Sequence, residues 1–385
     1  MTNLDPNPEL IDFNAPDNPS GLAPGFEEKH GQEFIVEVLE PRKVPLGGPR
    51  AMPVQRTLPQ RARSLIGAWC FLDYFGPDDV AASGGMQVPR HPHTGLATVS
   101  WLFEGRIDHI DSAGNWALVR PGEVNLMNAG SGISHSEHSS TDTTALHGVQ
   151  LWYAFPEEHR FVAPHLDQYR PETIQGDGWR AQVAIGSLLG STSPVQTYSP
   201  LSAAEISLEP NTTLDIDVPA DHEHGLLAVE CTANFNGALI EQNHLGYLGT
   251  GVTKLQLSSG NTPIRVMLIG GEPLEEDIVM WWNFVGRSHD EIALWRQRYQ
   301  AEMGFEPAGD HSPLSGYHLD QPVAGPLLDE LVPSAYPDDT AFPQYGQFPP
   351  NQPDPLPAPA LPSVAMKPRQ NPPTVARRKT RRNGR

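Results

Sequence analysis

The chain has 385 residues, enough for two hydrophobic cores, and its 35 glycines and 40 prolines favour short strands joined by turns. Its formal net charge of −20 argues against direct nucleic-acid binding by the folded part, since phosphate binding depends on clustered Lys and Arg. Only Cys70 and Cys231 occur, too few for a disulfide scaffold, which predicts a reducing, cytoplasmic setting. No apolar run is long enough to span a bilayer, and no basic-then-apolar leader opens the sequence, so we expect neither export nor a membrane partner.

Residues 1–32 are rich in Pro, Asn, Asp and Gly with few large apolar side chains, which predicts a flexible N-terminal arm. The first barrel is expected over residues 33–164. Its strands include Leu96 to Phe103, Val124 to Met127 and the strongly β-favouring run Val149 to Phe155. Residues 157–171 then look like the linker to the second half.

Two pairs of possible metal ligands stand out in this first half. His91 and His93 are two residues apart, and so are His135 and Glu137. On an extended strand, side chains at i and i+2 leave the same face, so each pair can aim both donors into one space. Two such strands facing each other inside a barrel would supply three nitrogens and one oxygen to a single divalent metal, with coordination positions left open as in a catalytic site.

A single His-x-His pair is more often a surface loop than a metal site, and the second pair is what favours metal binding here. The odd positions Val99, Trp101 and Phe103 are predicted to continue the face of His91 and His93. Trp101, Phe103 and Met127 could then line an apolar pocket for a flat aromatic ring, although ordinary core filling explains them equally well.

Other polar residues near these pairs have simpler interpretations. His109 and Asp111 fall in a turn that Asp111 and Ser112 can hold by hydrogen bonds, so we expect no catalytic part for them. His138 has the wrong parity to join the metal and is expected to face outward. His147 precedes a strand and could support a ligand through an outer hydrogen bond.

The second barrel is expected within residues 165–304, and it contains an incomplete copy of the first ligand pair. His222 and His224 repeat the His-x-His spacing, but no second His and Glu pair follows before Gly271. A polar turn is therefore favoured over a second metal. The candidate strands are Arg180 to Ile185, Ala204 to Leu208, Leu214 to Val218, Gly225 to Cys231, Gly237 to Ile240 and Ile264 to Ile269.

A helix is predicted after Ser288, which can cap it with Glu291 three residues on. Its apolar face is expected to hold Ile292, Trp295 and Tyr299, and Gly304 follows its end. Residues 305–385 are proline-rich and short of core formers, so a disordered tail is expected. Its basic end, Arg377 to Arg382, could contact acidic surfaces, but a solvated tail is favoured.

Taken in order, these motifs resemble the pirin family of the cupin superfamily over roughly residues 33 to 303. The spacing of several segments makes the resemblance specific rather than a single pattern. The segments that carry it are Phe71–Pro77, His91–Gly95, Leu102–Gly105, His109–Gly114, Pro121–Glu123, Ala129–Glu137, Leu146–Trp152 and Gly270–Leu274.

The resemblance implies an all-β bicupin, with two tandem jelly-roll-like barrels, a metal-free second barrel and a short C-terminal helix before the tail. In pirins the residues matching His91, His93, His135 and Glu137 bind a metal, usually iron. The ligand set by itself suits Fe(II), Ni(II), Mn(II), Co(II), Cu(II) or Zn(II).

Two functions of different class follow from the resemblance. Several pirins cleave the flavonol quercetin with dioxygen, which implies a metal-dependent dioxygenase here, with Glu137 as general base and a small aromatic substrate. The alternative is a non-catalytic, redox-sensitive iron protein that acts through a protein partner. A buried ligand set serves both, so the sequence does not separate enzyme from regulator.

Overall fold

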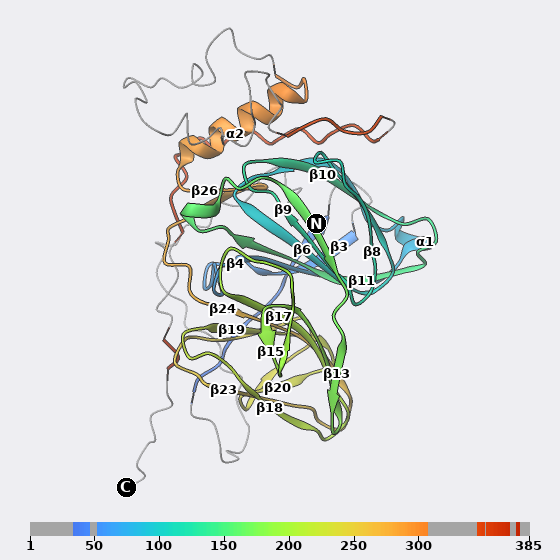
Figure 1. Ribbon diagram of the computed structural model, residues 1–385, viewed down its shortest axis with the longest axis vertical. Coiled ribbons are helices and arrows are strands. Elements are labelled where there is room, and N and C mark those ends of the chain that lie inside the picture. Colours follow the sequence, from blue (N-terminus) through green and yellow to red (C-terminus); the bar gives the residue numbers. More distant parts are fainter. Residues whose placement is uncertain (1–33, 47–51, 307–344, 351, 370–374, 378–385) are drawn as a thin grey trace.

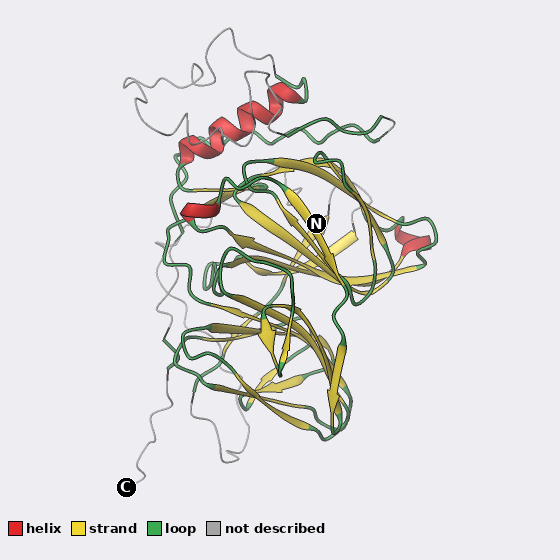
Figure 2. Ribbon diagram, in the orientation of Figure 1, coloured by secondary structure: helices red, strands yellow, loops and turns green. Residues whose placement is uncertain are grey.

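The computed structural model describes residues 34–46, 52–306, 345–350, 352–369 and 375–377. The expected N-terminal arm, residues 1–32, lies outside these ranges. Strands are the predominant regular structure of the described chain (Figure 2), as an all-β fold requires. They form two barrels, and α2 lies at the end of the first barrel that faces away from the second (Figure 1). No helix among the described residues is both long and apolar enough to cross a membrane.

The first barrel consists of a seven-stranded sheet, in the order β12-β9-β6-β11-β4-β3-β2, and a four-stranded sheet, in the order β5-β10-β7-β8. A short helix, α1 (Val80–Ser83), follows β4. The strands are β2 (Arg42–Leu46), β3 (Met52–Leu58), β4 (Trp69–Asp79), β5 (Gln87–His93), β6 (Leu96–Glu104), β7 (Ile107–Asp111), β8 (Trp116–Val119), β9 (Val124–Asn128), β10 (Ile133–Ser139), β11 (Ala145–Ala154) and β12 (His165–Tyr169).

The second barrel repeats this plan, with a seven-stranded sheet in the order β1-β22-β19-β24-β17-β14-β13 and a four-stranded sheet in the order β18-β23-β20-β21. The hairpins β15–β16 and β25–β26 stand apart from these sheets. The strands are β1 (Glu37–Leu39), β13 (Thr173–Gly176), β14 (Trp179–Ile185), β15 (Ser187–Leu188), β16 (Ser191–Thr192), β17 (Leu201–Leu208), β18 (Thr213–Asp217), β19 (Glu223–Glu230), β20 (Ala233–Phe235), β21 (Ala238–Ile240), β22 (Leu245–Leu248), β23 (Lys254–Ser258), β24 (Ile264–Gly271), β25 (Val279–Trp281) and β26 (Phe284–Gly286).

Two short strands cross the boundary that the sequence predicted between the halves. β1, assigned to the first barrel over residues 33–164, pairs with β22 in the second, with Leu39 opposite Leu245. β12, assigned to the linker, pairs with β9 in the first barrel, with His165 opposite Asn128. Each strand extends an edge of a seven-stranded sheet, and an edge strand this short carries no sequence signal that identifies its partner.

The two seven-stranded sheets share one hydrophobic core, because the face that each turns toward the other barrel is apolar. Val99, Trp101 and Tyr153 supply the first side, and Leu227 and Ile269 supply the second. The four-stranded sheet of the first barrel, which carries the predicted ligands, therefore lies away from this interface. That arrangement leaves the interior of the first barrel for the site.

The helix α2 (His289–Glu302) has the predicted N-terminal cap, since Ser288 Oγ accepts a hydrogen bond of 3.2 Å from the Glu291 backbone N–H. The Glu291 side chain does not return the bond to Ser288 as a capping box would. It accepts 2.7 Å hydrogen bonds from the Arg287 backbone N–H and from Arg160, which lies in the turn after η1 (Glu157–His159). The helix is thereby tied to the first barrel.

Part of the tail that the structure describes packs on the first barrel and α2, so the disorder predicted for residues 305–385 does not hold at these positions. Tyr345 is fully buried, and its carbonyl oxygen accepts a 2.6 Å hydrogen bond from Ser134 Oγ of β10. The chain then lies along α2 (Figure 1), where the Tyr299 hydroxyl donates a 2.7 Å bond to Leu356 O. Composition predicts the absence of a separate core but not this aromatic anchor. Of the basic cluster Arg377 to Arg382, only Arg377 lies within the described residues.

Candidate metal centre

The two predicted ligand pairs lie on neighbouring antiparallel strands. β5 carries His91 and His93, β10 carries His135 and Glu137, and His135 stands directly opposite His91 in the register. The sequence predicted strands facing each other across a barrel, whereas the structure places both pairs in one sheet. Directly opposed residues have Cβ atoms about 5 Å apart, so adjacent strands bring the donors together as well as facing ones would. A register shift between His135 and Glu137 marks an irregularity at the site.

The three imidazoles form one compact group inside the barrel. The ring centroid of His91 is 4.3 Å from that of His135, and the ring of His93 is 5.0 Å from each of the other two. His91 Nε2 and His93 Nε2 are 3.1 Å apart, and one nitrogen from each of the three rings lies within 4.8 Å of the others. All three residues are fully buried. Such convergent nitrogens fit a common cation.

Burial keeps these imidazoles neutral. It lowers the pKa of His91 to about 3, and it lowers the pKa of His93 and His135 well below the ordinary value, with neighbouring imidazoles adding to the effect. A metal binds the neutral form of the ring, so the depressed pKa values favour coordination over protonation. The chemistry of the donor set therefore fits a divalent metal.

Glu137 extends from the same strand into a polar part of the barrel interior. Its Oε1 lies 3.4 Å from Ser100 Oγ of β6 and 3.4 Å from Gln150 Nε2 of β11. Asn125 of β9 stands opposite Ser100 on the same face. The carboxylate thus faces hydrogen-bond donors on the seven-stranded sheet. Among the imidazoles, its ligand oxygen lies within 4.8 Å of the ligand nitrogens of His135 and His109, so the group of His91, His93 and His135 and the group that contains Glu137 meet at His135.

His109 is part of the site, contrary to the expectation that it lies in a simple turn. It lies on β7 directly opposite Glu137, is fully buried, and brings its Nδ1 to 3.4 Å from His135 Nδ1. Ligand atoms of His109, His135 and Glu137 lie within 4.8 Å of one another. Asp111 does hold the turn, as predicted, by accepting hydrogen bonds from Ala113 and Asn115. The spacing of His109 and Asp111, again two residues, was the signal that could have revealed this third inward pair.

Trp101 and Phe103 do not line the site. Trp101 Nε1 donates a 2.8 Å hydrogen bond to Glu205 of the second barrel, and Phe103 packs beside His147 and Arg265. The chain leaves one sheet after His93 and enters the other at Leu96, so the parity of β5 does not continue into β6. Core filling, the alternative explanation, is correct for these two residues.

The aromatic side chain beside the centre is Trp152, whose indole lies edge-on to His93 with ring centroids 5.0 Å apart. It shares its strand face with Gln150 and stacks on Phe71 at 4.0 Å. Met127 is also buried, in contact with Ile133 of β10. From the sequence, Met127 was expected near the site, whereas Trp152 was assigned only to the strongly β-favouring run Val149 to Phe155.

Two nearby histidines lie apart from the group. His138 is half-buried, and its Nδ1 is 3.0 Å from Gln87 Oε1. His147 lies 2.9 Å from the Tyr74 hydroxyl and packs beside Phe103. In the second barrel, the rings of His222 and His224 are 6.3 Å apart, and Glu223 instead accepts a 2.7 Å hydrogen bond from the Gly67 backbone N–H.

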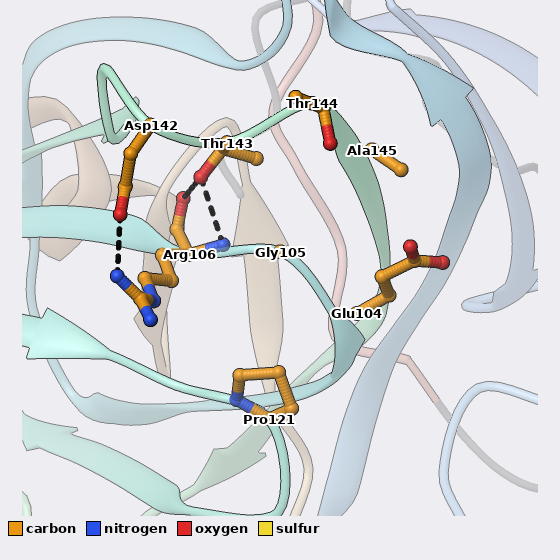
Figure 3. Close-up of a pocket in the computed structure, with 8 residues that line it drawn as sticks. All are labelled: Glu104, Gly105, Arg106, Pro121, Asp142, Thr143, Thr144 and Ala145. Carbon is orange, nitrogen blue, oxygen red and sulfur yellow. Dashed lines mark hydrogen bonds and ion pairs between the residues drawn. The ribbon is translucent and has the colours of Figure 1, made fainter.

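A surface hollow lies at the far end of β6 and contains none of the candidate ligands (Figure 3). Arg106 and Asp142 pair on one side of it, and Thr143 Oγ1 accepts a 3.1 Å hydrogen bond from the Arg106 backbone N–H. The hollow has no imidazole in its lining, and its charged pair is already neutralised. The candidate ligands therefore lie elsewhere, in the buried cluster.

The pirin family model matches residues 51–153, and the pirin C-terminal cupin domain matches residues 203–305. The chain belongs to the pirin family. This pirin is 40% identical over 297 residues to a putative quercetin 2,3-dioxygenase, PA1205, of Pseudomonas aeruginosa, a match that covers 77% of the chain and 92% of that protein. It is 32% identical over 286 residues to a pirin-like protein of Caulobacter vibrioides, covering 71% of the chain and 96% of the relative.

A solved structure shares the two-cupin architecture of this pirin. It is the crystal structure of quercetin 2,3-dioxygenase from Acinetobacter baumannii, which superimposes with a TM-score of 0.71 at 32% identity and covers 87% of this chain and 98% of that one. The predicted all-β bicupin fold is therefore confirmed.

Proposed function

We propose that this pirin is a metal-dependent dioxygenase of the quercetin 2,3-dioxygenase type, which cleaves an aromatic enol such as a flavonol. The observation that carries the proposal is the convergence of His91, His93 and His135, with the buried carboxylate of Glu137 close to His135. The relative from Pseudomonas aeruginosa and the structure from Acinetobacter baumannii, both named for this activity, support the choice of reaction.

His91, His93, His135 and Glu137 would hold the metal, and we propose Fe(II) as its identity, with Ni, Mn, Co, Cu and Zn as the alternatives that the same donors accept. When bound, the metal supplies Lewis acidity and redox chemistry for the reaction with dioxygen. The three imidazoles reach it in neutral form, because burial disfavours their protonation.

Glu137 is the proposed general base. Its Oε1 is held by Ser100 and Gln150, both at 3.4 Å, so the carboxylate points into the barrel interior, where a substrate hydroxyl can lose its proton to it. Trp152 and Met127 give the interior flat and flexible apolar surface, which suits an aromatic ring system. Both described cysteines are free thiols, in keeping with the cytoplasmic location that we also propose.

The test is oxygen uptake by the iron-loaded full chain with quercetin, compared between the wild type, Glu137→Gln and Glu104→Gln. Glu104 is an exposed carboxylate at the end of β6 and serves as the matched control. Loss of the base should lower the rate of uptake by about 100-fold or more, since general base catalysis contributes roughly that factor. Wild-type rates in Glu137→Gln would contradict the assigned base. An absence of metal-dependent uptake in all three, combined with capture of a protein partner that depends on iron oxidation, would favour the regulator instead.

A further inference from the structure

Each imidazole of the proposed metal site has two ring nitrogens, of which one can bind the metal. The other nitrogen of His91 has a backbone hydrogen-bond acceptor. His91 Nδ1 lies 2.9 Å from the carbonyl oxygen of Pro89, so Nδ1 carries the proton and Nε2 is left with its lone pair for the metal. A carbonyl oxygen can only accept, which makes this tautomer unambiguous. His135 differs, because its Nδ1 lies beside another imidazole, whose nitrogen can either donate or accept.

We propose that Asp111 fixes the tautomer of His135 through His109, so that His109 is a positioning residue of the metal centre and not one of its ligands. The geometry is a line of contacts from β7 to β10: His109 Nε2 is 3.4 Å from Asp111 Oδ2, and His109 Nδ1 is 3.4 Å from His135 Nδ1. The remaining nitrogen, His135 Nε2, is buried and has no hydrogen-bond partner among the described residues. The inference rests on the metal binding contained in the proposed function.

The direction of the relay is set at Asp111. Its Oδ1 accepts hydrogen bonds from the backbone N–H groups of Ala113 and Asn115, at 2.9 and 3.0 Å, and the Asn115 amide donates to both carboxylate oxygens. All of these partners are donors, so Asp111 acts as an acceptor, and His109 must place its proton on Nε2. His109 Nδ1 then accepts from His135 Nδ1–H, which leaves the lone pair of His135 Nε2 for the metal.

The register explains why this chain of groups can form. His135 stands opposite Asp111 on the neighbouring strand, and Glu137 stands opposite His109, so all four side chains leave the same face of the sheet. His109 and Asp111 are both fully buried, which excludes water from the contacts and strengthens each hydrogen bond. The carboxylate, although it is not a ligand, therefore acts on the metal through two imidazoles.

The test uses four forms of the full chain: wild type, Asp111→Asn, His109→Asn and the double variant. In Asp111→Asn the new amide can donate to His109 Nε2, which reverses the His109 tautomer and deprives His135 of its acceptor. In His109→Asn the Oδ1 of the new side chain lies near the position of Nδ1 and can still accept from His135. The matched control is His138→Phe, since His138 neighbours Glu137 but bonds to Gln87.

The measurement is the dissociation constant for Co(II), obtained by competition with a chelating dye in the absence of flavonol, together with the Co(II) absorption spectrum. We expect Asp111→Asn to bind Co(II) about 10- to 100-fold more weakly than the wild type, because loss of the outer hydrogen-bond partner of a metal-bound histidine typically costs that much affinity. His109→Asn and His138→Phe should stay within a few-fold of the wild type. The double variant should match His109→Asn, because no imidazole remains to be reversed.

If Asp111→Asn lowers the Co(II) affinity equally in the wild-type and His109→Asn backgrounds, Asp111 has only a structural role and the proposal is overturned. An X-ray absorption spectrum with four imidazoles in the wild type and three in His109→Asn would overturn it in favour of direct ligation. If Asp111→Asn fails to fold, His109→Phe removes the acceptor instead, and wild-type affinity in that variant would contradict the relay. Tight Co(II) binding without any flavonol cleavage would refute the proposed dioxygenase while leaving the relay intact.

Discussion

The indole nitrogen of Trp101 donates a 2.8 Å hydrogen bond to Oε2 of Glu205, and this bond joins the two barrels through their shared core. Trp101 is fully buried. Burial raises the pKa of Glu205, while the hydrogen bond from Trp101 and the nearby charge of Arg265 oppose that rise. The charged form of the Glu205 carboxylate is therefore stabilised by Trp101 and Arg265 against the effect of burial.

Replacing Trp101 with Phe should remove this bond, keep most of the apolar volume and leave a buried acceptor unsatisfied. We expect the free energy of unfolding to fall by about 1–3 kcal/mol, the usual cost of such a group. Urea denaturation measures the change. The matched control is Trp116→Phe, because Trp116 is 78% exposed and should tolerate the change. Equal stability of the two variants would mean that the inter-barrel bond contributes nothing.

The position of Trp101 also shows what the sequence could and could not predict. Alternation along β6 correctly divides the strand into two faces, and one of them carries Ser100 toward Glu137. Which face meets the interior depends on how the chain turns between His93 and Leu96, where it changes sheets. Strand periodicity contains no information about that turn, so the sequence could not decide between pocket lining and core filling for Trp101.

The tail anchor Tyr345 gives a second prediction about stability. Its ring is buried in a cluster of aromatic side chains, and its hydroxyl lies 3.1 Å from Thr94 Oγ1. Tyr345→Ala should lower the free energy of unfolding by about 3–5 kcal/mol through the cavity it leaves. Tyr345→Phe should lower it by about 1 kcal/mol through the lost hydrogen bond.

Urea denaturation again provides the measurement, with Val364→Ala as the control on the same tail, since Val364 is 59% exposed. If Tyr345→Ala were as stable as Val364→Ala, the claim that Tyr345 anchors the tail to the first barrel would be contradicted. Composition could not have predicted this anchor, because nothing distinguishes Tyr345 from the other two tyrosines of the proline-rich tail until its partners on the first barrel are known.

His147 predicts how stability depends on pH. Burial, with the charge of Arg265 adding to it, lowers the pKa of His147 to about 4, so the folded protein keeps this ring neutral. The unfolded chain titrates near its ordinary value of about 6.5 and binds more protons between these two values. Stability from this residue is therefore full above about pH 6.5 and is lost as the pH falls toward about 4, at up to roughly 1.4 kcal/mol per pH unit.

The variant His147→Phe keeps a ring beside Phe103 but cannot titrate. As the pH falls from 7 to 4, the free energy of unfolding should decrease less steeply in the variant than in the wild type, because the variant lacks the one group whose pKa is depressed on folding. Identical slopes would show that His147 does not contribute to the acid sensitivity of the fold.

Most of the fold and the centre of the candidate site were accessible from the sequence, each for a physical reason. The i and i+2 spacing of His91 with His93 and of His135 with Glu137 places side chains on one face of a strand, so the pairs could be predicted without a structure. His109 and Asp111 have the same spacing, but their nearness to the other pairs depends on which strand lies beside β10, a relation set by sheet order. The partner of β1 was missed for the same reason.

Metal content tests the central claim most directly. Elemental analysis of the purified full chain should find a single divalent metal ion bound per chain in the wild type and in His138→Ala. His91→Ala and His135→Ala, each of which removes one of two opposed imidazoles, should lose it. Retention of the metal in both of these variants, or its absence from a wild type supplied with Fe(II), would contradict a metal centre built on His91, His93, His135 and Glu137.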